Sequence, residues 1–293
     1  MDNNAIEVFL TVTETGSFRK AAETLGYTQA GVSYIIKSIE EDTGLNLFIR
    51  DRKGVRLSPE GEALLPEIKQ IDNDHRHLME KISDLKGLES GTVRVQIFDS
   101  MSIHWLPGIL KKFKDDYPQI TVELISEENT AKAEEMVITG EVDCGFFLTH
   151  VTGPIDVFPL KEEGLLAVVS TEHELAGADT FPVSRLSDYP YISMRYESTN
   201  GIDDIFDRCN AVKNTAYYLD NDYAAMAMAS SGLGFCIFPE LLLIDAPYEI
   251  CCLPFDKPQS RTISIGTRSM DSASNACRKF IEYAIEWVNE NAK

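Results

Sequence analysis

The stretch GSFRKAAETLGYTQAGVSYIIKSIE, residues 16–40, decides how the chain begins to fold. Apolar residues recur in it at three- and four-residue intervals on both sides of the turn GY, which predicts two short amphipathic helices. Gly16 ends a preceding helix, and Ser17 and Thr28 stand where helix N-caps are needed. Two helices joined by such a turn indicate a helix-turn-helix.

The second helix of this pair has an outward face of small and polar side chains, without an acid before Glu40. The residues expected to contact DNA from this helix are Thr28, Gln29, Ala30, Ser33, Tyr34 and Lys37. Gln29 offers both a donor and an acceptor to an adenine edge, whereas Ser33 and Lys37 suit phosphate. Tyr34 can pack on a sugar or a thymine methyl. Taken alone, this face is more typical of a solvated helix surface.

The next stretch, LNLFIRDRKGVRLS at residues 45–58, predicts a small β-hairpin. Apolar and polar residues alternate on both sides of the turn-like DRKG. Its basic residues are Arg50, Arg52, Lys53 and Arg56, which with Asp51 make a local charge of +3. Such a hairpin forms a wing beside the helix-turn-helix, where its cations meet the phosphate backbone.

The charge of the whole chain is −20, which argues against unspecific nucleic-acid binding by its surface. Residues 91–293 carry 16 Lys and Arg against 31 Asp and Glu, a net charge of −15. Residues 1–90 carry only −5. The acidity therefore belongs mainly to the second part of the chain.

A long helix is expected after the wing, with Ser58 as its N-cap and Pro59 at its first position. Apolar residues follow a 4-3 spacing typical of a coiled-coil seam at Leu64, Ile68, Ile71, His75, Leu78, Ile82 and Leu85. A helix with one such stripe needs a partner, and a second copy of the chain is the simplest one. His75 and His77 point in different directions on a helix, so they are not expected to bind one metal ion.

The remaining residues alternate predicted strands with predicted helices, which indicates an α/β domain with a largely parallel sheet. The pattern occurs twice, and the chain then returns to the first unit, which favours two hinged subdomains around a cleft. The expected organisation is a winged helix-turn-helix at 1–58, a linker helix at 59–90 and an α/β domain at 91–293. Subdomain I is expected at about 91–161 and 266–293, and subdomain II at about 162–265.

The N-terminal segment resembles the LysR-type transcriptional regulators. The matching residues are Phe9, Glu14, Gly16, Ser17, Phe18, Ala21, Ala22, Leu25, Thr28, Gln29, Val32, Ser33, Ile36, Ile39, Glu40, Gly44, Leu47, Phe48, Arg50, Arg52, Leu57 and Gly61. The family often has other residues at the positions of Ala30, Gly31, Tyr34 and Ile35. These differences concern which DNA sequence is recognised and not whether DNA is bound. The resemblance implies DNA binding, dimerisation through the linker and assembly into tetramers. The expected DNA partner is a double-stranded promoter site resembling an inverted repeat.

The C-terminal part resembles the family's effector domain, which is built like the periplasmic binding proteins. The matching residues are Ser100, Leu106, Pro107, Phe113, Tyr117, Pro118, Gly140, Asp143, Pro159, Leu160, Gly232, Gly234 and Pro239. The family position of the cleft implies an effector site at Ser100, Met101, Ser102, Thr149, Tyr196, Asn200, Gly201, Asn221 and Asp222. The hydroxyls of Ser100 and Ser102 suit an anion, although they serve equally well as helix caps. Glu127 and Glu128 favour a zwitterion or a cation instead, so a small polar organic effector is expected without a choice of charge.

Two other function classes were weighed. An enzyme is not expected, because the sequence has no GxSxG, no HExxH and no glycine-rich phosphate loop. A thiol redox sensor is conceivable from the pair Cys251 and Cys252 and from Cys209 near Arg208, but core cysteines are the simpler interpretation. No cofactor or metal is expected. The absence of a signal peptide and of a long apolar run predicts a cytoplasmic protein without membrane contact.

Overall fold

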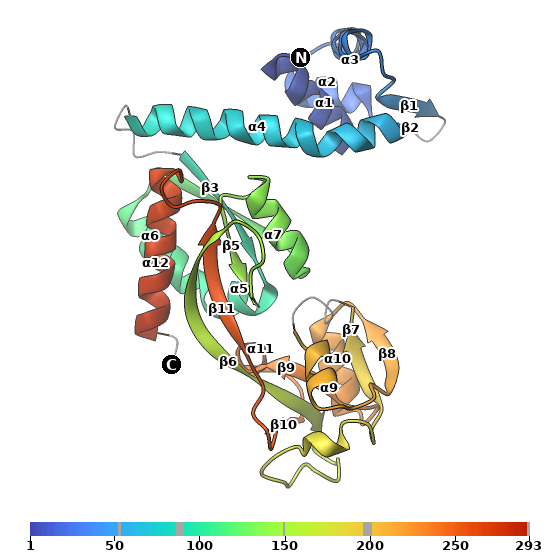
Figure 1. Cartoon of the computed structure of the whole chain (residues 1–293), viewed down its shortest axis with the longest axis vertical. Helices are drawn as coiled ribbons and strands as arrows, with labels where there is room; N and C mark the ends of the chain where they lie inside the picture. Colours follow the sequence, from blue (N-terminus) through green and yellow to red (C-terminus); the bar gives the residue numbers. More distant parts are fainter. Residues whose placement is uncertain (52–53, 86–90, 149, 196–200, 292–293) are drawn as a thin grey trace. The chain divides into compact units, whose positions relative to one another are not determined.

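A computed structural model describes residues 1–51, 54–85, 91–148, 150–195 and 201–291. The chain divides into two compact units, an N-terminal unit with the helix-turn-helix and an α/β unit that begins at β3. Each unit is described by itself, with the labels of Figure 1. Five of the expected site residues lie outside the described residues, namely Arg52, Lys53, Thr149, Tyr196 and Asn200.

The N-terminal unit consists of three short helices, a two-stranded hairpin and a long helix. These are α1 (Asn3–Thr15), α2 (Phe18–Leu25), α3 (Gln29–Thr43), β1 (Phe48–Asp51), β2 (Gly54–Leu57) and α4 (Pro59–Leu85). The three expected N-caps are confirmed. Ser17 Oγ accepts from the Lys20 amide at 3.4 Å, Thr28 Oγ1 from Gly31 at 3.1 Å and Ser58 Oγ from Gly61 at 2.9 Å. The helix-turn-helix and its wing are therefore both present.

The hairpin is attached to the turn between α1 and α2. The Val55 amide donates to the Gly16 carbonyl at 3.0 Å. Gly54 has a φ of +135°, and a Cβ there would lie 2.9 Å from the Gly16 oxygen. The approach of the two backbones therefore requires glycine at position 54, and it holds the wing against the helices.

The seam of α4 divides into two parts. Ile68 is only 3% exposed, since it packs with the partly buried Leu64 in the core of α1–α3 and the hairpin. Further along, Ile71 is 50% exposed, Leu78 57% and Leu85 81%. His75 is exposed and lies 2.6 Å from the Asn3 side chain, nitrogen to nitrogen. The first part of the seam is thus occupied within the chain, and the second part presents apolar side chains on the surface.

The α/β unit contains a seven-stranded sheet and a two-stranded sheet. The first subdomain is built from β3 (Gly91–Ile97), α5 (Asp99–His104), α6 (Leu106–Asp116), β4 (Ile120–Ser126), α7 (Thr130–Ile138), β5 (Cys144–Phe147) and α12 (Asn275–Asn291). The second contains η1 (Val183–Arg185), β7 (Tyr191–Met194), α9 (Asp203–Arg208), β8 (Thr215–Leu219), α10 (Asp222–Ser230), β9 (Cys236–Pro239), α11 (Glu240–Leu243) and β10 (Ile250–Pro254). The long strands β6 (Asp156–Ser170) and β11 (Ser260–Thr267) belong to both.

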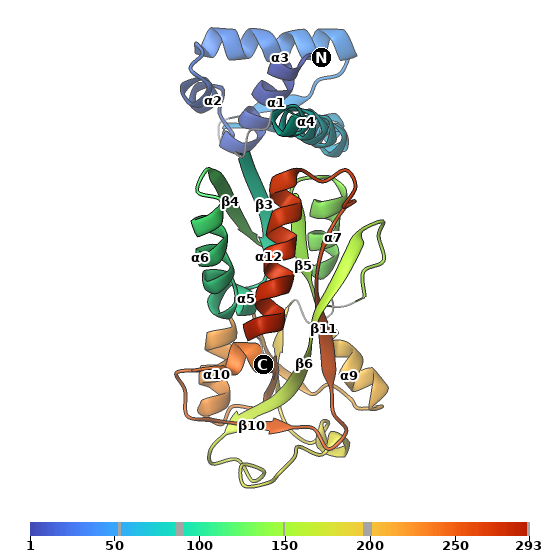
Figure 2. The same ribbon diagram turned by 90° about the vertical axis from the view of Figure 1, so that its left-hand side faces the viewer.

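Helices cover both faces of the first subdomain's sheet. Successive residues of a strand point to opposite faces, so Phe146 of β5 joins the core under α5, α6 and α12, while Phe147 joins the cluster under α7. Figure 2 shows α12 lying along the sheet, with α6 and α7 on either side of it in this view. The helices α5 and α6 are separated only by Trp105, and Pro107 lies in the first turn of α6, where it is tolerated.

The expectation of a largely parallel sheet is only partly correct. β3 pairs parallel with β4 and β5, but β11 is antiparallel to β5 and β6, and β6 is antiparallel to β9 and β10. The reason is that the chain leaves the first subdomain on β6 and returns on β11, as Figure 1 shows. The expected subdomain boundaries, 161/162 and 265/266, fall inside these two strands.

The described residues include no helix with the length and apolar character needed to cross a membrane. All six cysteines lie in the described part of the chain, and each is a free thiol.

Candidate DNA-binding surface and effector cleft

The N-terminal half of α3 is an exposed face of polar and small side chains. Gln29 and Ala30 are exposed, Ser33 is half-buried, and Tyr34 is 74% exposed. The opposite side of the helix buries Val32, Ile36 and Ile39 in the core. Lys37 is also exposed and lies 3.2 Å from Glu41 in a surface ion pair. Such a pair is weak, so the Lys37 ammonium remains available to a phosphate.

The wing places Arg50 beside this face. The Arg50 guanidinium lies 4.3 Å from the centre of the Phe18 ring, and its Nη2 donates to Ser33 Oγ at 3.2 Å. The cation–π contact and the hydrogen bond orient an otherwise flexible side chain. Arg56 is exposed on the other strand of the hairpin. The helix and the wing therefore share one surface, which carries positive charge.

Glu40 connects α3 to the wing. Its Oε1 accepts hydrogen bonds from the amides of Leu47 at 2.7 Å and Phe48 at 3.2 Å. The sequence showed Glu40 only as the first acid of the helix face. Its carboxylate instead holds the start of β1 against the recognition helix through charge-assisted hydrogen bonds.

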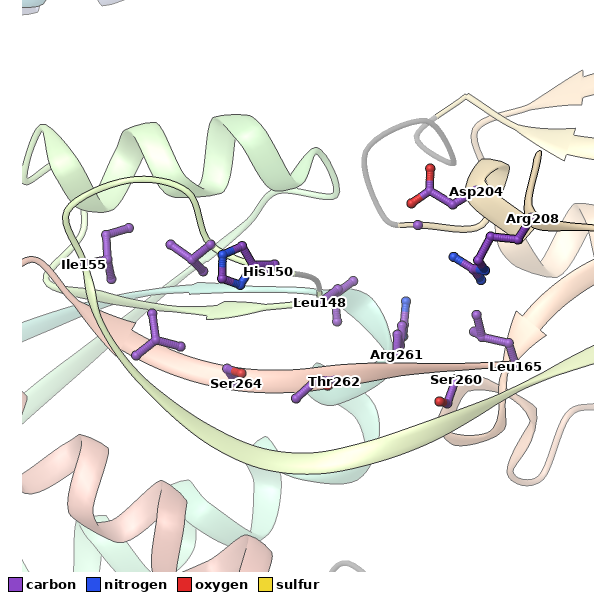
Figure 3. Close-up of a pocket in the computed structure, with 13 residues that line it drawn as sticks. Leu148, His150, Ile155, Leu165, Asp204, Arg208, Ser260, Arg261, Thr262 and Ser264 are labelled. Carbon is purple, nitrogen blue, oxygen red and sulfur yellow. The ribbon is translucent and has the colours of Figure 1, made fainter. Parts of the chain in front are cut away.

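The α/β unit contains a cleft of about 630 Å³ (Figure 3). One wall is apolar and includes Leu148, Val151 and Ile155. The polar lining comes from the loop after β5, from α9 and from β11, at His150, Asp204, Arg208, Ser260, Arg261, Thr262 and Ser264, and Gly201 before α9 completes the lining. An apolar cavity of this size with a few convergent polar groups is typical of a small-molecule site.

Two guanidinium groups point into this cleft in Figure 3. Arg208 extends from the last turn of α9, and its Nη2 donates to Gln259 Oε1 at 2.9 Å. Arg261 is 8% exposed, and its Nε donates to Glu163 Oε2 at 2.8 Å. Glu163 is itself buried and also accepts from the Leu241 amide at 3.0 Å. Arg261 is thus neutralised by a buried partner, whereas Arg208 is exposed.

A narrow pocket of about 20 Å³ adjoins the cleft, since Leu148 and Arg261 line both. Its polar lining adds Ser100, Glu128 and Asp222. The pKa of Glu128 is raised to about 7. Burial is the largest cause, and the charges of Asp99 and Asp222 add to it, while a hydrogen bond from the Asp99 amide and the charge of Arg261 act in the opposite direction. This carboxyl group is therefore poised between its charged and neutral forms near neutral pH.

The residues expected to bind an effector have different positions in the structure. Ser100 and Asp222 line the narrow pocket, and Gly201 lines the larger cleft. Met101 is fully buried in the core, so the expectation of a cleft contact for its side chain is wrong. Ser102 donates to the Asp99 carbonyl at 2.7 Å, and Asn221 is the N-cap of α10.

The hydroxyls that line the larger cleft come from β11, at Ser260, Thr262 and Ser264. The sequence contained a signal for them, because residues at i, i+2 and i+4 of a strand share one face. No comparable sequence pattern marked Arg208, Asp204 and His150, because chain segments far apart in sequence bring them to the cleft.

The cysteines do not favour the thiol-sensor hypothesis. Cys144, Cys236 and Cys277 are buried. Burial raises the pKa of the Cys144 and Cys252 thiols, which lowers the fraction of reactive thiolate. Within the described ranges, no group of three His, Cys, Asp or Glu residues is arranged to hold a metal ion.

Two family profiles cover most of the chain. The bacterial regulatory helix-turn-helix of the lysR family matches residues 3–62, and the LysR substrate binding domain matches residues 86–289. The chain belongs to the LysR family of transcriptional regulators. In this LysR-type regulator, the N-terminal domain binds DNA and the α/β domain binds a small-molecule effector.

Related proteins match nearly the full length of this LysR-type regulator. The HTH-type transcriptional regulator YvbU of Bacillus subtilis (strain 168) is 29% identical over 285 residues, covering 96% of this chain and 97% of YvbU. Full-length CbnR in complex with its target DNA has the same fold, with a TM-score of 0.71 and 19% identity over 98% of this chain and all of that chain. The effector binding domain of QuiR, solved with shikimate, has a TM-score of 0.61 and 21% identity over 69% of this chain and 99% of that chain.

Proposed function

We propose that this regulator binds its operator with the N-terminal half of α3 in the major groove and with the wing on the phosphate backbone. Gln29 and Tyr34 are the exposed side chains of α3 suited to base edges. Arg50 and Arg56 hold phosphates, and we assign the same role to Arg52 and Lys53 from their place in the sequence of the wing. The contact between Arg50 and Ser33 supports this assignment, because it joins helix and wing in one surface.

The second part of the α4 seam pairs with the same surface of a second copy. Ile71, Leu78 and Leu85 are at least half exposed in the single chain, at the seven-residue interval of one core position of a coiled coil. The resulting homodimer reads two half-sites of a promoter site resembling an inverted repeat. Two dimers form a homotetramer in the proposed assembly.

The effector of this regulator binds in the cleft of about 630 Å³. The observation that carries this proposal is the combination of one apolar wall with hydroxyls and guanidiniums on the facing strand and helix. The effector binding domain of QuiR, solved in complex with shikimate, supports a small polar molecule as the type of effector for this fold. Because β6 and β11 connect the two subdomains, closure of the cleft on a ligand alters the α/β unit as a whole.

The test is to fill the cleft. Thr262 is exposed on β11 and lines the cavity, so Thr262→Trp blocks it without removing a core side chain. Thr121→Trp, at an exposed position of the edge strand β4, is the matched control. Promoters bound by the wild type are mapped in cells by chromatin immunoprecipitation and fused to a reporter.

Thr262→Trp is expected to bind these promoters normally and to lose the response of the reporter to growth conditions or added metabolites. Thr121→Trp is expected to retain both properties. A full response from the Thr262→Trp variant would place the effector site elsewhere.

A further inference from the structure

The cleft and the narrow pocket beside it differ in charge. The narrow pocket contains Glu128 and Asp222, with Asp99 close enough to affect Glu128 electrostatically. The cleft contains Arg208 as an exposed cation and Asp204 of the same helix as an exposed acid, together with a row of hydroxyls on β11. Leu148 and Arg261 line both spaces.

Arg261 does not balance the acids of the narrow pocket. Its guanidinium is 2.8 Å from the buried Glu163 carboxylate, so this pair is neutral as a whole. The Asp99 amide donates to Glu128 Oε1 at 2.9 Å, which fixes the Glu128 side chain at the pocket wall. Burial and the charges of Asp99 and Asp222 outweigh the charge of Arg261 at Glu128, so its carboxylate is only partly compensated. The pocket has room for only a small group.

The opposite end of the cleft suits an anion. Arg208 points into the cavity in Figure 3, and its bond to the neutral Gln259 leaves its charge uncompensated by that contact. Thr262 adds a hydroxyl to the same cavity, whereas the Ser260 hydroxyl donates to Glu162 Oε1 at 2.6 Å. A carboxylate there would accept charge-assisted hydrogen bonds from a guanidinium.

From this arrangement we infer that the effector is an amino-carboxylate, whose ammonium group binds between Glu128 and Asp222 and whose carboxylate faces Arg208. The inference rests on the proposed effector site and adds the chemical class of its ligand. The apolar wall with Val151 and Ile155 then contacts the hydrocarbon part of the molecule.

A linkage between binding and protonation follows. Glu128 faces Asp99 of α5, Asp222 of α10 and Arg261 of β11, and its pKa of about 7 applies to the empty site. An ammonium group stabilises the Glu128 carboxylate, so binding releases a proton when the pH is below about 7. The affinity of an amine-bearing ligand therefore falls as the pH is lowered through 7, by up to about tenfold per pH unit. A ligand with only carboxylates at the same place would show the opposite dependence, since it favours the neutral form of Glu128.

The experiment uses the full-length regulator and a matched panel of compounds. The panel contains the common L-amino acids, 4-aminobutyrate and 5-aminovalerate, with succinate and glutarate as carboxylates without an amine, and 1,4-diaminobutane as an amine without a carboxylate. Binding is screened by the shift in melting temperature and measured by calorimetry between pH 6 and 8. For each amino-carboxylate that binds, loss of either group is expected to lower the affinity about tenfold or more.

Glu128→Gln keeps the shape of the side chain and removes its charge. It is expected to lower the affinity for the amino-carboxylate about tenfold and to abolish the pH dependence. Glu127→Gln is the control, because Glu127 lies next in sequence but forms an ion pair with Lys132 at 2.5 Å and does not line the pocket. Arg208→Ala is expected to lower the affinity for the amino-carboxylate but to leave the affinity for 1,4-diaminobutane unchanged.

The outcomes separate this inference from the proposed site. Binding of carboxylates alone, with an affinity that rises on acidification and is lost in Thr262→Trp, would overturn the ligand class and keep the cleft. A panel in which no amine-bearing compound binds would also overturn it. Binding of an amino-carboxylate that Thr262→Trp leaves unchanged would refute the cleft itself.

Discussion

The two units of this regulator use the same side chain in opposite ways. Arg50 of the wing is exposed and is held by an aromatic ring and a hydroxyl, neither of which removes its charge. Arg261 of the α/β unit is almost fully buried and is matched by the Glu163 carboxylate. An exposed cation attracts phosphate at little cost in stability, whereas a buried cation is tolerated only with its partner.

The difference extends to the whole of each unit. The N-terminal unit presents Gln29, Tyr34, Leu78, Arg50 and Arg56 to its surroundings. The α/β unit, which carries most of the −20 charge, lines an internal cleft with its polar groups. Its surface acidity disfavours unspecific contact with DNA. Substitutions in the first unit should therefore change binding to other molecules, while those at buried charges of the second should change stability.

The largest effect is expected from Glu163→Gln. The substitution leaves the Arg261 charge buried without its counter-charge, which costs about 3–5 kcal/mol of the free energy of unfolding. Urea denaturation of the full-length protein, followed by circular dichroism, measures this loss. Glu162→Gln is the control, since Glu162 is the exposed neighbour on the same strand.

A double substitution sharpens the same prediction. Glu163→Leu with Arg261→Met removes both charges and is expected to recover most of the lost stability. If Glu163→Gln alone unfolds at the urea concentration of the wild type, the buried pair has no stabilising role.

The next effect concerns the exposed part of the seam. Replacing Ile71 and Leu78 together by Asp places two charges per chain in the proposed interface, and the dissociation constant of the dimer is expected to rise at least about 100-fold, or ~2.7 kcal/mol. Analytical ultracentrifugation measures the assembly. Met79→Asp is the control, because Met79 is 52% exposed but lies outside the 4-3 spacing. An unchanged mass for the double variant would show that the dimer uses another surface.

A smaller effect is expected for base recognition. Gln29→Ala removes an exposed donor and acceptor from α3 and should reduce the discrimination at one base pair of each half-site by about 1–3 kcal/mol. Selection of binding sites from randomised DNA measures the preference. An identical consensus for the variant and the wild type would show that Gln29 does not read a base.

The smallest effect is expected from Arg50→Ala. Loss of one phosphate contact should weaken operator and random DNA equally, by about 1 kcal/mol, and should reduce the slope of log affinity against log salt by about 1. Fluorescence anisotropy at several salt concentrations measures both quantities. Lys257→Ala, at an exposed position of the α/β unit, should leave the slope unchanged. A loss confined to the operator would assign Arg50 to base recognition instead.

Local patterns in the sequence were enough to predict the N-terminal unit. Caps at Ser17, Thr28 and Ser58 act on amides three residues away, and the helical period is set within a few turns. The wing was predicted from the alternation of apolar and polar residues in 45–58. In the α/β unit the same patterns located most strands and helices but not their pairing, because the direction of β6 and β11 depends on the path between two subdomains.

The sequence by itself thus determined the helix-turn-helix, the wing, the linker helix and the α/β class of the second domain. Only the tertiary structure decided that Ile68 is a core residue while Ile71 is exposed, since both are seam positions of the heptad pattern. It also decided the chemistry of the cleft. Glu163 and Arg261 are 98 residues apart, and Glu128 meets Asp222 only after the sheet has formed. Burial and electrostatic partners depend on such long-range packing, and no local pattern encodes them.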